Sequence, residues 1–143
     1  MLVGSKNYRT IEASEDQSYV KIIDQTSLPF KFKIIHLRTL DEVVRAIKNM
    51  QVRGAPLIGV TAAYGFALSM NFDSSDNSLS KCKNDLVNAR PTAVNLSWAV
   101  NQVYDALIKC PSKERVELSW ELAIKLANQD VEKNISIGLH GYN

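Results

Sequence analysis

The sequence predicts an α+β fold, in which a small antiparallel sheet at the N-terminus is followed by a bundle of about five helices. Three observations indicate this fold. Alternating apolar residues are confined to residues 1–38, helical periodicity begins at Thr39, and proline and serine signals then mark further helix starts. A chain of 143 residues fits one domain. We place that domain at 1–143, with 1–38 as the sheet and 39–137 as the helical part.

The predicted strands are short runs in which apolar residues alternate, at 7–12, 18–25 and 32–37. The SLP segment at 27–29 supplies a break between the second and third strands. Asp24 is interpreted as a turn residue that bonds to the backbone nearby. His36, within the third apolar run, is interpreted as a structural histidine rather than a ligand.

The first two helices have clear start signals. Thr39 and Glu42 form a predicted capping box for a helix over 39–50. The second helix is predicted over 56–70, with Pro56 in its first turn. Small residues recur in it every four positions, which favours close helix packing. Its apolar, uncharged composition approaches that of a membrane span, but we expect a helix buried inside the domain.

The later helices are less sharply marked. We predict a polar surface loop over 71–80, then a short helix that ends before Arg90, and a helix over 92–108. Ser112 is the predicted N-cap of a last, long helix. The buried stripe of that helix is predicted at Val116, Trp120, Ala123, Ala127 and Val131. Trp98 and Trp120 are both predicted to lie in the core.

Composition excludes several classes of function. A net charge of +2, without runs of basic residues, does not favour nucleic acid or an acidic membrane as a partner. Cys82 and Cys110 are the two cysteines and have no histidine near them in sequence, so zinc-ligand spacing is missing. We interpret both as inert, reduced thiols in a cytoplasmic protein.

Two stretches repeat one arrangement, in which an arginine and a proline precede a helix of small and apolar residues. The first reads RGAP from Arg53, and the second reads RP from Arg90. A helix start carries free N–H groups and the positive end of the helix dipole. A guanidinium there adds charge of the same sign, which is unfavourable unless an anion such as phosphate lies between. We predict that Arg53 and Arg90 bind phosphate, with the Gly54 and Ala55 backbone close to the ligand.

Two alternatives remain open for these arginines: each could cap the C-terminus of a helix or pair with an acidic side chain. Asn95 faces either a ligand or solvent. No acid–base pair, nucleophile triad, metal cluster or glycine-rich phosphate loop can be assembled from the sequence. The residues therefore indicate a binding site without reacting groups.

Four segments resemble the N-terminal domain of methylthioribose-1-phosphate isomerases: IIDQTSLP, VRGAPLIGVTAAYGFAL, ARPTAVNLSWAV and NISIGLHG. They occur in order over nearly the whole chain, and two of them contain the arginines. These enzymes are similar to the regulatory subunits of translation initiation factor 2B and to ribose-1,5-bisphosphate isomerases. The RGAP and RPTAVN segments point to the methylthioribose enzymes.

The resemblance implies conversion of 5-methylthioribose 1-phosphate to 5-methylthioribulose 1-phosphate in methionine salvage, without a metal or nucleotide cofactor. It places Arg53, Gly54, Ala55 and Arg90 at the substrate. It also implies a catalytic cysteine and aspartate in a C-terminal α/β domain, within THCN and GADR motifs that do not occur in these 143 residues. We therefore expect a catalytically incomplete chain, either an isolated domain or a gene fragment.

Two other functions remain open: a non-catalytic regulatory module related to the initiation-factor subunits, and a ribose-1,5-bisphosphate isomerase. The paired arginines favour the methylthioribose enzyme, because a purely structural homologue does not need them. The predicted partner is a small sugar phosphate, with no nucleic acid and no membrane. For the full-length protein the resemblance implies a homodimer.

Overall fold

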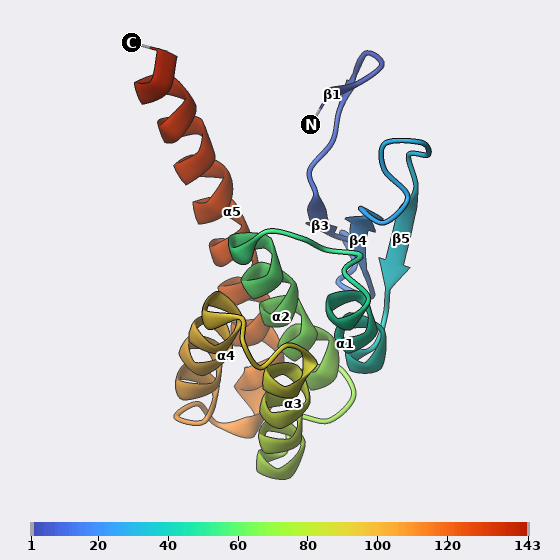
Figure 1. Cartoon of the computed structure of the whole chain (residues 1–143). Helices are drawn as coiled ribbons and strands as arrows, with labels where there is room; N and C mark the ends of the chain where they lie inside the picture. The colour runs from blue at the N-terminus through green and yellow to red at the C-terminus, as the bar shows by residue number, and fades with distance from the viewer. Residues whose placement is uncertain (1, 143) are drawn as a thin grey trace.

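A three-stranded antiparallel sheet followed by five α-helices confirms the predicted α+β fold (Figure 1). The structure, a computed structural model, describes residues 2–142. The sheet has the order β3 (Ile11–Ala13), β4 (Val20–Ile23) and β5 (Ile34–Leu37), and a small hairpin precedes it, formed by β1 (Leu2–Val3) and β2 (Lys6–Asn7). The helices are α1 (Leu40–Lys48), α2 (Ala55–Met70), α3 (Asp76–Ala89), α4 (Val94–Leu107) and α5 (Arg115–Tyr142), with a 3-10 turn η1 (Ser112–Glu114) before α5.

The first strand begins later than predicted. Pairing with β4 starts at Ile11, whereas residues 6–7 pair with residues 2–3. Between these pairings the chain runs beside α5, where the Arg9 guanidinium donates to the carbonyl of Ala127 at 3.3 Å and to Oδ1 of Asn128 at 3.0 Å. The predicted strand over 7–12 is therefore divided, since residues 6–7 pair within the N-terminal hairpin and pairing with β4 begins only at Ile11.

Two local predictions near the sheet can be placed directly. The Asp24 carboxylate accepts a hydrogen bond from the backbone N–H of Thr26 at 3.1 Å, which confirms its turn role. His36 lies exposed on β5 and stacks on Tyr19, with ring centroids 4.6 Å apart. The capping box of α1 is also confirmed, since Thr39 Oγ1 accepts from the Glu42 N–H at 3.2 Å and the Glu42 carboxylate accepts from the Thr39 N–H at 3.3 Å.

Helix α2 forms the centre of the domain and packs against each of the other four helices. From residue 57 to residue 70 every position except Ser69 is buried. Among residues 2–142, one helical segment, Ala55–Phe72, is long and apolar enough to cross a membrane. However, 72% of this segment is buried inside the domain. Burial among four helices accounts for its composition.

Small residues on α2 allow its neighbours to approach closely. A Cβ at Gly59 would lie 3.1 Å from Cβ of Ala99 and 3.2 Å from the carbonyl oxygen of Asn95, both on α4. A Cβ at Gly65 would lie 3.1 Å from side-chain carbons of Leu86 on α3 and Val43 on α1. Both glycines therefore have packing reasons that outweigh their cost of about 1 kcal/mol each in a helix interior.

Two predictions about helix starts were wrong. The predicted loop over 71–80 is shorter, because Ser75 caps α3 by accepting from the Ser78 N–H at 3.2 Å, and Asp76 favours the positive end of the helix dipole. Ser112 does not cap the last helix. It begins η1, and its hydroxyl donates to the Ser74 carbonyl at 3.0 Å.

The last helix has a buried half and an exposed half. Trp120, Ala123 and Ala127 are buried, and the indole N–H of Trp120 donates to Oδ1 of Asn71 at 3.0 Å. The predicted stripe ends there, because α5 continues past the start of α2 and Val131 is 39% exposed (Figure 1). The prediction that Trp98 lies in the core was also wrong, since its side chain is 57% exposed.

Candidate functional site

Helices α2 and α4 begin at the same end of the helical bundle, which we call the open end. Their N-cap residues are Gly54 and Ala93, and neither start has a side-chain cap or an acidic residue in its first turn. Helices α1 and α3 differ, because each begins with a side-chain cap and an acidic first turn. The backbone N–H groups at the open end thus have neither a capping side chain nor an acidic residue beside them, which leaves them available to bind an anion.

Gly54 shapes the start of α2. Its φ of 93° lies in the region that favours glycine, and a Cβ there would meet nothing within 4 Å. The backbone conformation, rather than lack of space, therefore requires glycine. Pro56 contributes no N–H, and the Ile58 N–H bonds to the Gly54 carbonyl at 3.0 Å. Free donors at this start are accordingly those of Ala55 and Leu57.

Arg53 lies directly before Gly54, the N-cap of α2, whereas Arg90 lies three residues before Ala93, the N-cap of α4. Arg53 is exposed, and Arg90 is half-buried at the C-cap of α3. Among residues 2–142 neither guanidinium makes an ion pair or a hydrogen bond. A carboxylate pair thus finds no supporting contact in the described residues, whereas the position of Arg90 at the C-cap of α3 agrees with the alternative role at a helix C-terminus. Phosphate binding by Arg53, Gly54, Ala55 and Arg90 stays a prediction.

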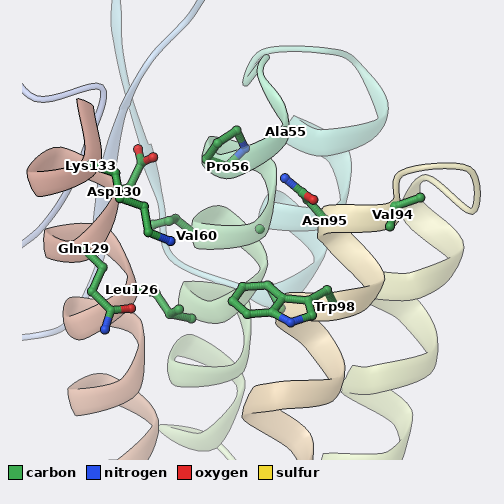
Figure 2. A pocket seen from close by; sticks show the side chains of 12 residues that line it. Ala55, Pro56, Val60, Val94, Asn95, Trp98, Leu126, Gln129, Asp130 and Lys133 are labelled. Atoms are coloured by element: carbon green, nitrogen blue, oxygen red, sulfur yellow. The ribbon is translucent and has the colours of Figure 1, made fainter. Parts of the chain in front are cut away.

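A cavity of about 390 Å³ opens beside these helix starts, between α2, α4 and α5 (Figure 2). Figure 2 shows the Trp98 indole reaching across α2 toward Leu126, while Asn95 points toward the start of α2. The lining residues are Ala55, Pro56, Gly59 and Val60 from α2; Val94, Asn95, Trp98 and Ala99 from α4; and Leu126, Gln129, Asp130 and Lys133 from α5. The cavity therefore adjoins the start of α2, although neither Arg53 nor Arg90 lines it.

Sequence reasoning missed the contribution of α5 to this cavity. Gln129 and Lys133 are one turn apart, so they share a helix face, but a polar face is ordinarily solvated. Their spacing becomes informative only when α2 is known to lie beside them. The position of Trp98 at the cavity was missed for a related reason, since helical spacing does not show which side chains a neighbouring helix covers and which it leaves exposed.

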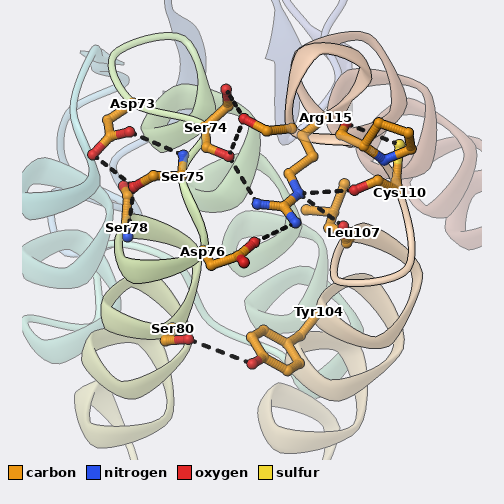
Figure 3. A network of polar contacts seen from close by, with 12 residues as sticks. Asp73, Ser74, Ser75, Asp76, Ser78, Ser80, Tyr104, Leu107, Cys110 and Arg115 are labelled. Carbon is orange, nitrogen blue, oxygen red and sulfur yellow. Dashed lines mark hydrogen bonds and ion pairs between the residues drawn. The ribbon is translucent and has the colours of Figure 1, made fainter.

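The opposite end of the bundle, the closed end, is held by a buried arginine (Figure 3). Arg115 is 4% exposed, and its Nε donates to the carbonyls of Leu107 at 2.9 Å and Cys110 at 3.2 Å. Its two terminal nitrogens donate to the Ser74 carbonyl at 2.8 Å and to the Asp76 carboxylate. This side chain links the end of α4 to the start of α3, and nothing in the sequence pattern singled it out.

The cysteines do not form a reactive site. Burial raises the pKa of the Cys82 thiol to about 12, so it stays protonated at neutral pH. Cys110 is half-buried at the closed end, and both thiols are free. Among the described residues no three His, Cys, Asp or Glu side chains come together in a group that could hold a metal ion.

Curated relatives of this chain are much longer than it is. Methylthioribose-1-phosphate isomerase from Escherichia coli O45:K1 (strain S88) is 48% identical over 141 residues, which cover 99% of this chain and 38% of that relative. The enzyme of the same name from Sinorhizobium medicae is 45% identical, with 99% and 39% covered. The chain thus spans about two fifths of the length of these relatives.

Solved structures agree with the fold. The crystal structure of 5-methylthioribose 1-phosphate isomerase from Pyrococcus horikoshii OT3 matches with a TM-score of 0.87 at 38% identity, covering 95% of this chain and 40% of that one. Subunit delta of translation initiation factor eIF-2B from A. fulgidus matches with a TM-score of 0.80 at 37% identity, covering 88% and 38%. The model of the Initiation factor 2 subunit family matches residues 51–143, which include α2, both arginines and the whole cavity. The chain therefore belongs to the initiation factor 2 subunit family.

Proposed function

We propose that these residues form the N-terminal, substrate-phosphate-binding domain of a methylthioribose-1-phosphate isomerase. The reaction is the aldose–ketose conversion of 5-methylthioribose 1-phosphate to 5-methylthioribulose 1-phosphate in methionine salvage. The names of the relatives support the reaction. The observation that carries the proposal is the open end, where two uncapped helix starts each follow an arginine without a partner among the described residues.

Electrostatics favours a phosphate between an arginine and a helix start. A guanidinium beside the positive end of a helix dipole is repelled by it, and a phosphate between them makes both interactions favourable. Arg53 and Arg90 would each supply charge-assisted hydrogen bonds, worth on the order of 1.5–3 kcal/mol apiece. Gly54 and Ala55 present backbone close to the ligand, since neither has a bulky side chain.

The proposed role is binding and orientation rather than the chemical step. The phosphate on the anomeric oxygen prevents simple ring opening, so the reaction needs an acid and then the movement of hydrogen from C2 to C1. Held phosphate fixes the sugar in one position for those steps. We assign the reacting cysteine and aspartate to the C-terminal part implied by the family resemblance, and we expect residues 1–143 alone to show no turnover.

Binding of 5-methylthioribose 1-phosphate to this chain, measured by isothermal titration calorimetry, tests the proposal. We expect Arg53→Ala and Arg90→Ala each to weaken binding by about 10- to 100-fold. Arg38→Ala is the matched control, because Arg38 is exposed on the sheet side and its guanidinium lies 5.4 Å from the Tyr19 ring centroid. Unchanged affinity in both single variants would show that the arginines have another role.

A regulatory module is the second candidate, supported by the eIF-2B subunit delta structure at 37% identity. A regulatory domain has no need to discriminate between sugar phosphates. Equal affinity for 5-methylthioribose 1-phosphate and inorganic phosphate would favour it over the isomerase domain. Cytoplasmic location and a homodimer for a longer protein complete the proposal, and the two free cysteines support the former.

A further inference from the structure

Trp98 is placed unusually for a large aromatic side chain. The two tryptophans of the chain contrast, since Trp120 is buried against Tyr64 whereas Trp98 is more than half exposed. A tryptophan buries up to about 250 Å² when it packs fully, so its exposure forfeits a large hydrophobic gain. Trp98 is held over the cavity rather than in the core (Figure 2).

The part of the cavity below Trp98 is apolar. Gly59 and Ala99 pack against each other and line the cavity with little side chain, while Val60 and Leu126 line it with branched aliphatic side chains. Polar side chains enter from α5 at the rim. A concave site of about 390 Å³ with apolar walls and a few polar groups has the size and character of a small-molecule site.

The cavity continues directly from the start of α2. Ala55 and Pro56 belong to the first turn of that helix and also line the cavity. A ligand whose phosphate lies at the helix start therefore extends along this wall toward Trp98. Asn95 points toward the same helix start and lies between the two regions (Figure 2).

We propose that this cavity binds the methylthio group of the sugar phosphate, with Trp98 as its principal contact. The inference rests on the proposed function, because it assumes that the phosphate lies at the open end. The two ends of 5-methylthioribose 1-phosphate then match two different surfaces: an anion meets helix starts and arginines, and a thioether meets an indole and aliphatic walls. Thioether sulfur makes favourable contacts with aromatic rings, and the methyl group gains from leaving water.

The inference predicts discrimination against sugar phosphates that carry a hydroxyl at C5. Ribose 1-phosphate has the same phosphate and ring but no methylthio group. A pocket that gains from an apolar group of this size separates such ligands by about tenfold. Trp98 is therefore a specificity-determining residue, distinct from the arginines, which act on both ligands alike.

The test compares the affinities of 5-methylthioribose 1-phosphate and ribose 1-phosphate for the chain and its variants by calorimetry. We expect the wild-type chain to bind the methylthio compound about tenfold more tightly. Trp98→Ala should bring that ratio close to one, and Trp98→Phe should keep part of it. Phe30→Ala is the control, because Phe30 is 97% exposed in the loop between β4 and β5 and should keep the full ratio.

Tryptophan fluorescence supplies a second readout. Trp98 is accessible and Trp120 is buried, so iodide quenching in the free chain reports chiefly on Trp98. Methylthio ligand should protect it, and ribose 1-phosphate should protect it less. Circular dichroism of both Trp98 variants checks that they remain folded.

The outcomes separate this inference from the proposed function. If ribose 1-phosphate binds and the methylthio compound binds no more tightly, the subsite is overturned while the phosphate site stands. If the advantage persists in Trp98→Ala and Trp98→Phe, the methylthio group lies elsewhere. If neither sugar phosphate binds, the proposed function and the subsite both fail.

Discussion

The two ends of the helical bundle hold their arginines in opposite ways. At the closed end, Arg115 is buried and donates to three backbone carbonyls and one carboxylate. At the open end, Arg53 and Arg90 have no such partner among the described residues. The helix starts follow the same division, since α3 at the closed end is capped by Ser75 and neither α2 nor α4 has a side-chain cap.

This contrast separates two uses of one residue type. Arg115 satisfies carbonyls that the end of α4 leaves without intrahelical partners, so its donors contribute to folding. The donors of the other two arginines are not used within the described domain. Proximity to a helix end therefore does not identify a structural arginine, whereas the hydrogen-bond acceptors around its guanidinium do.

The largest expected effect comes from removing the structural arginine. Arg115→Met should lower the free energy of unfolding by about 3 kcal/mol, because the three carbonyls of Leu107, Cys110 and Ser74 each lose a hydrogen bond to a buried guanidinium. Urea denaturation measures the change. Arg53→Met is the matched control and should stay within about 0.5 kcal/mol of wild type. Similar losses in the two variants would break the contrast between the ends.

Ligand binding at the open end should change the free energy of unfolding, whereas substitution of its arginines alone should not. Ribose 1-phosphate at about 100 times its Kd should raise the free energy of unfolding by about 2.7 kcal/mol. The double variant Arg53→Ala/Arg90→Ala should lose this increase while its ligand-free stability stays near that of wild type. Thermal denaturation with and without the ligand measures both quantities. An undiminished increase in the double variant would place the anion at another site.

The smallest expected effect is at the carboxylate of the closed end. Asp76→Asn should lower the free energy of unfolding by about 1 kcal/mol or less, because the Asp76 side chain is 77% exposed and its ion pair is screened by water. The three carbonyl bonds of Arg115 remain in this variant. A loss in urea denaturation as large as that of Arg115→Met would assign the stabilisation to the ion pair instead.

Local signals predicted much of the fold. The capping box at Thr39 and Glu42 was predicted because both partners lie within one turn of sequence. Part of the buried face of α5 was likewise predicted from spacing, since Trp120, Ala123 and Ala127 are all buried. The start of α3 was missed because a run of polar residues suggested a loop, although Ser75 and Asp76 are good helix-start residues.

Features that depend on distant contacts could not be predicted. Trp98 and Leu96 belong to the same helix, but only the position of α2 and α5 decides that one is buried and the other lines a cavity. Arg115 was missed because its acceptors at residues 74, 76, 107 and 110 converge only in three dimensions. The candidate phosphate ligands, by contrast, could be proposed from the sequence, because the RGAP and RP segments are local patterns that precede predicted helices.

The close packing at Gly59 has a consequence for ligand size. Helices α2 and α4 touch there through a hydrogen atom and a methyl group, one turn after their first residues. That contact sets how far apart the two helices begin, and with it the gap that a single anion would have to bridge. A methyl group added at Gly59 would push α2 and α4 apart and widen the gap between their first residues. It would do so from a position one turn away from the proposed phosphate site.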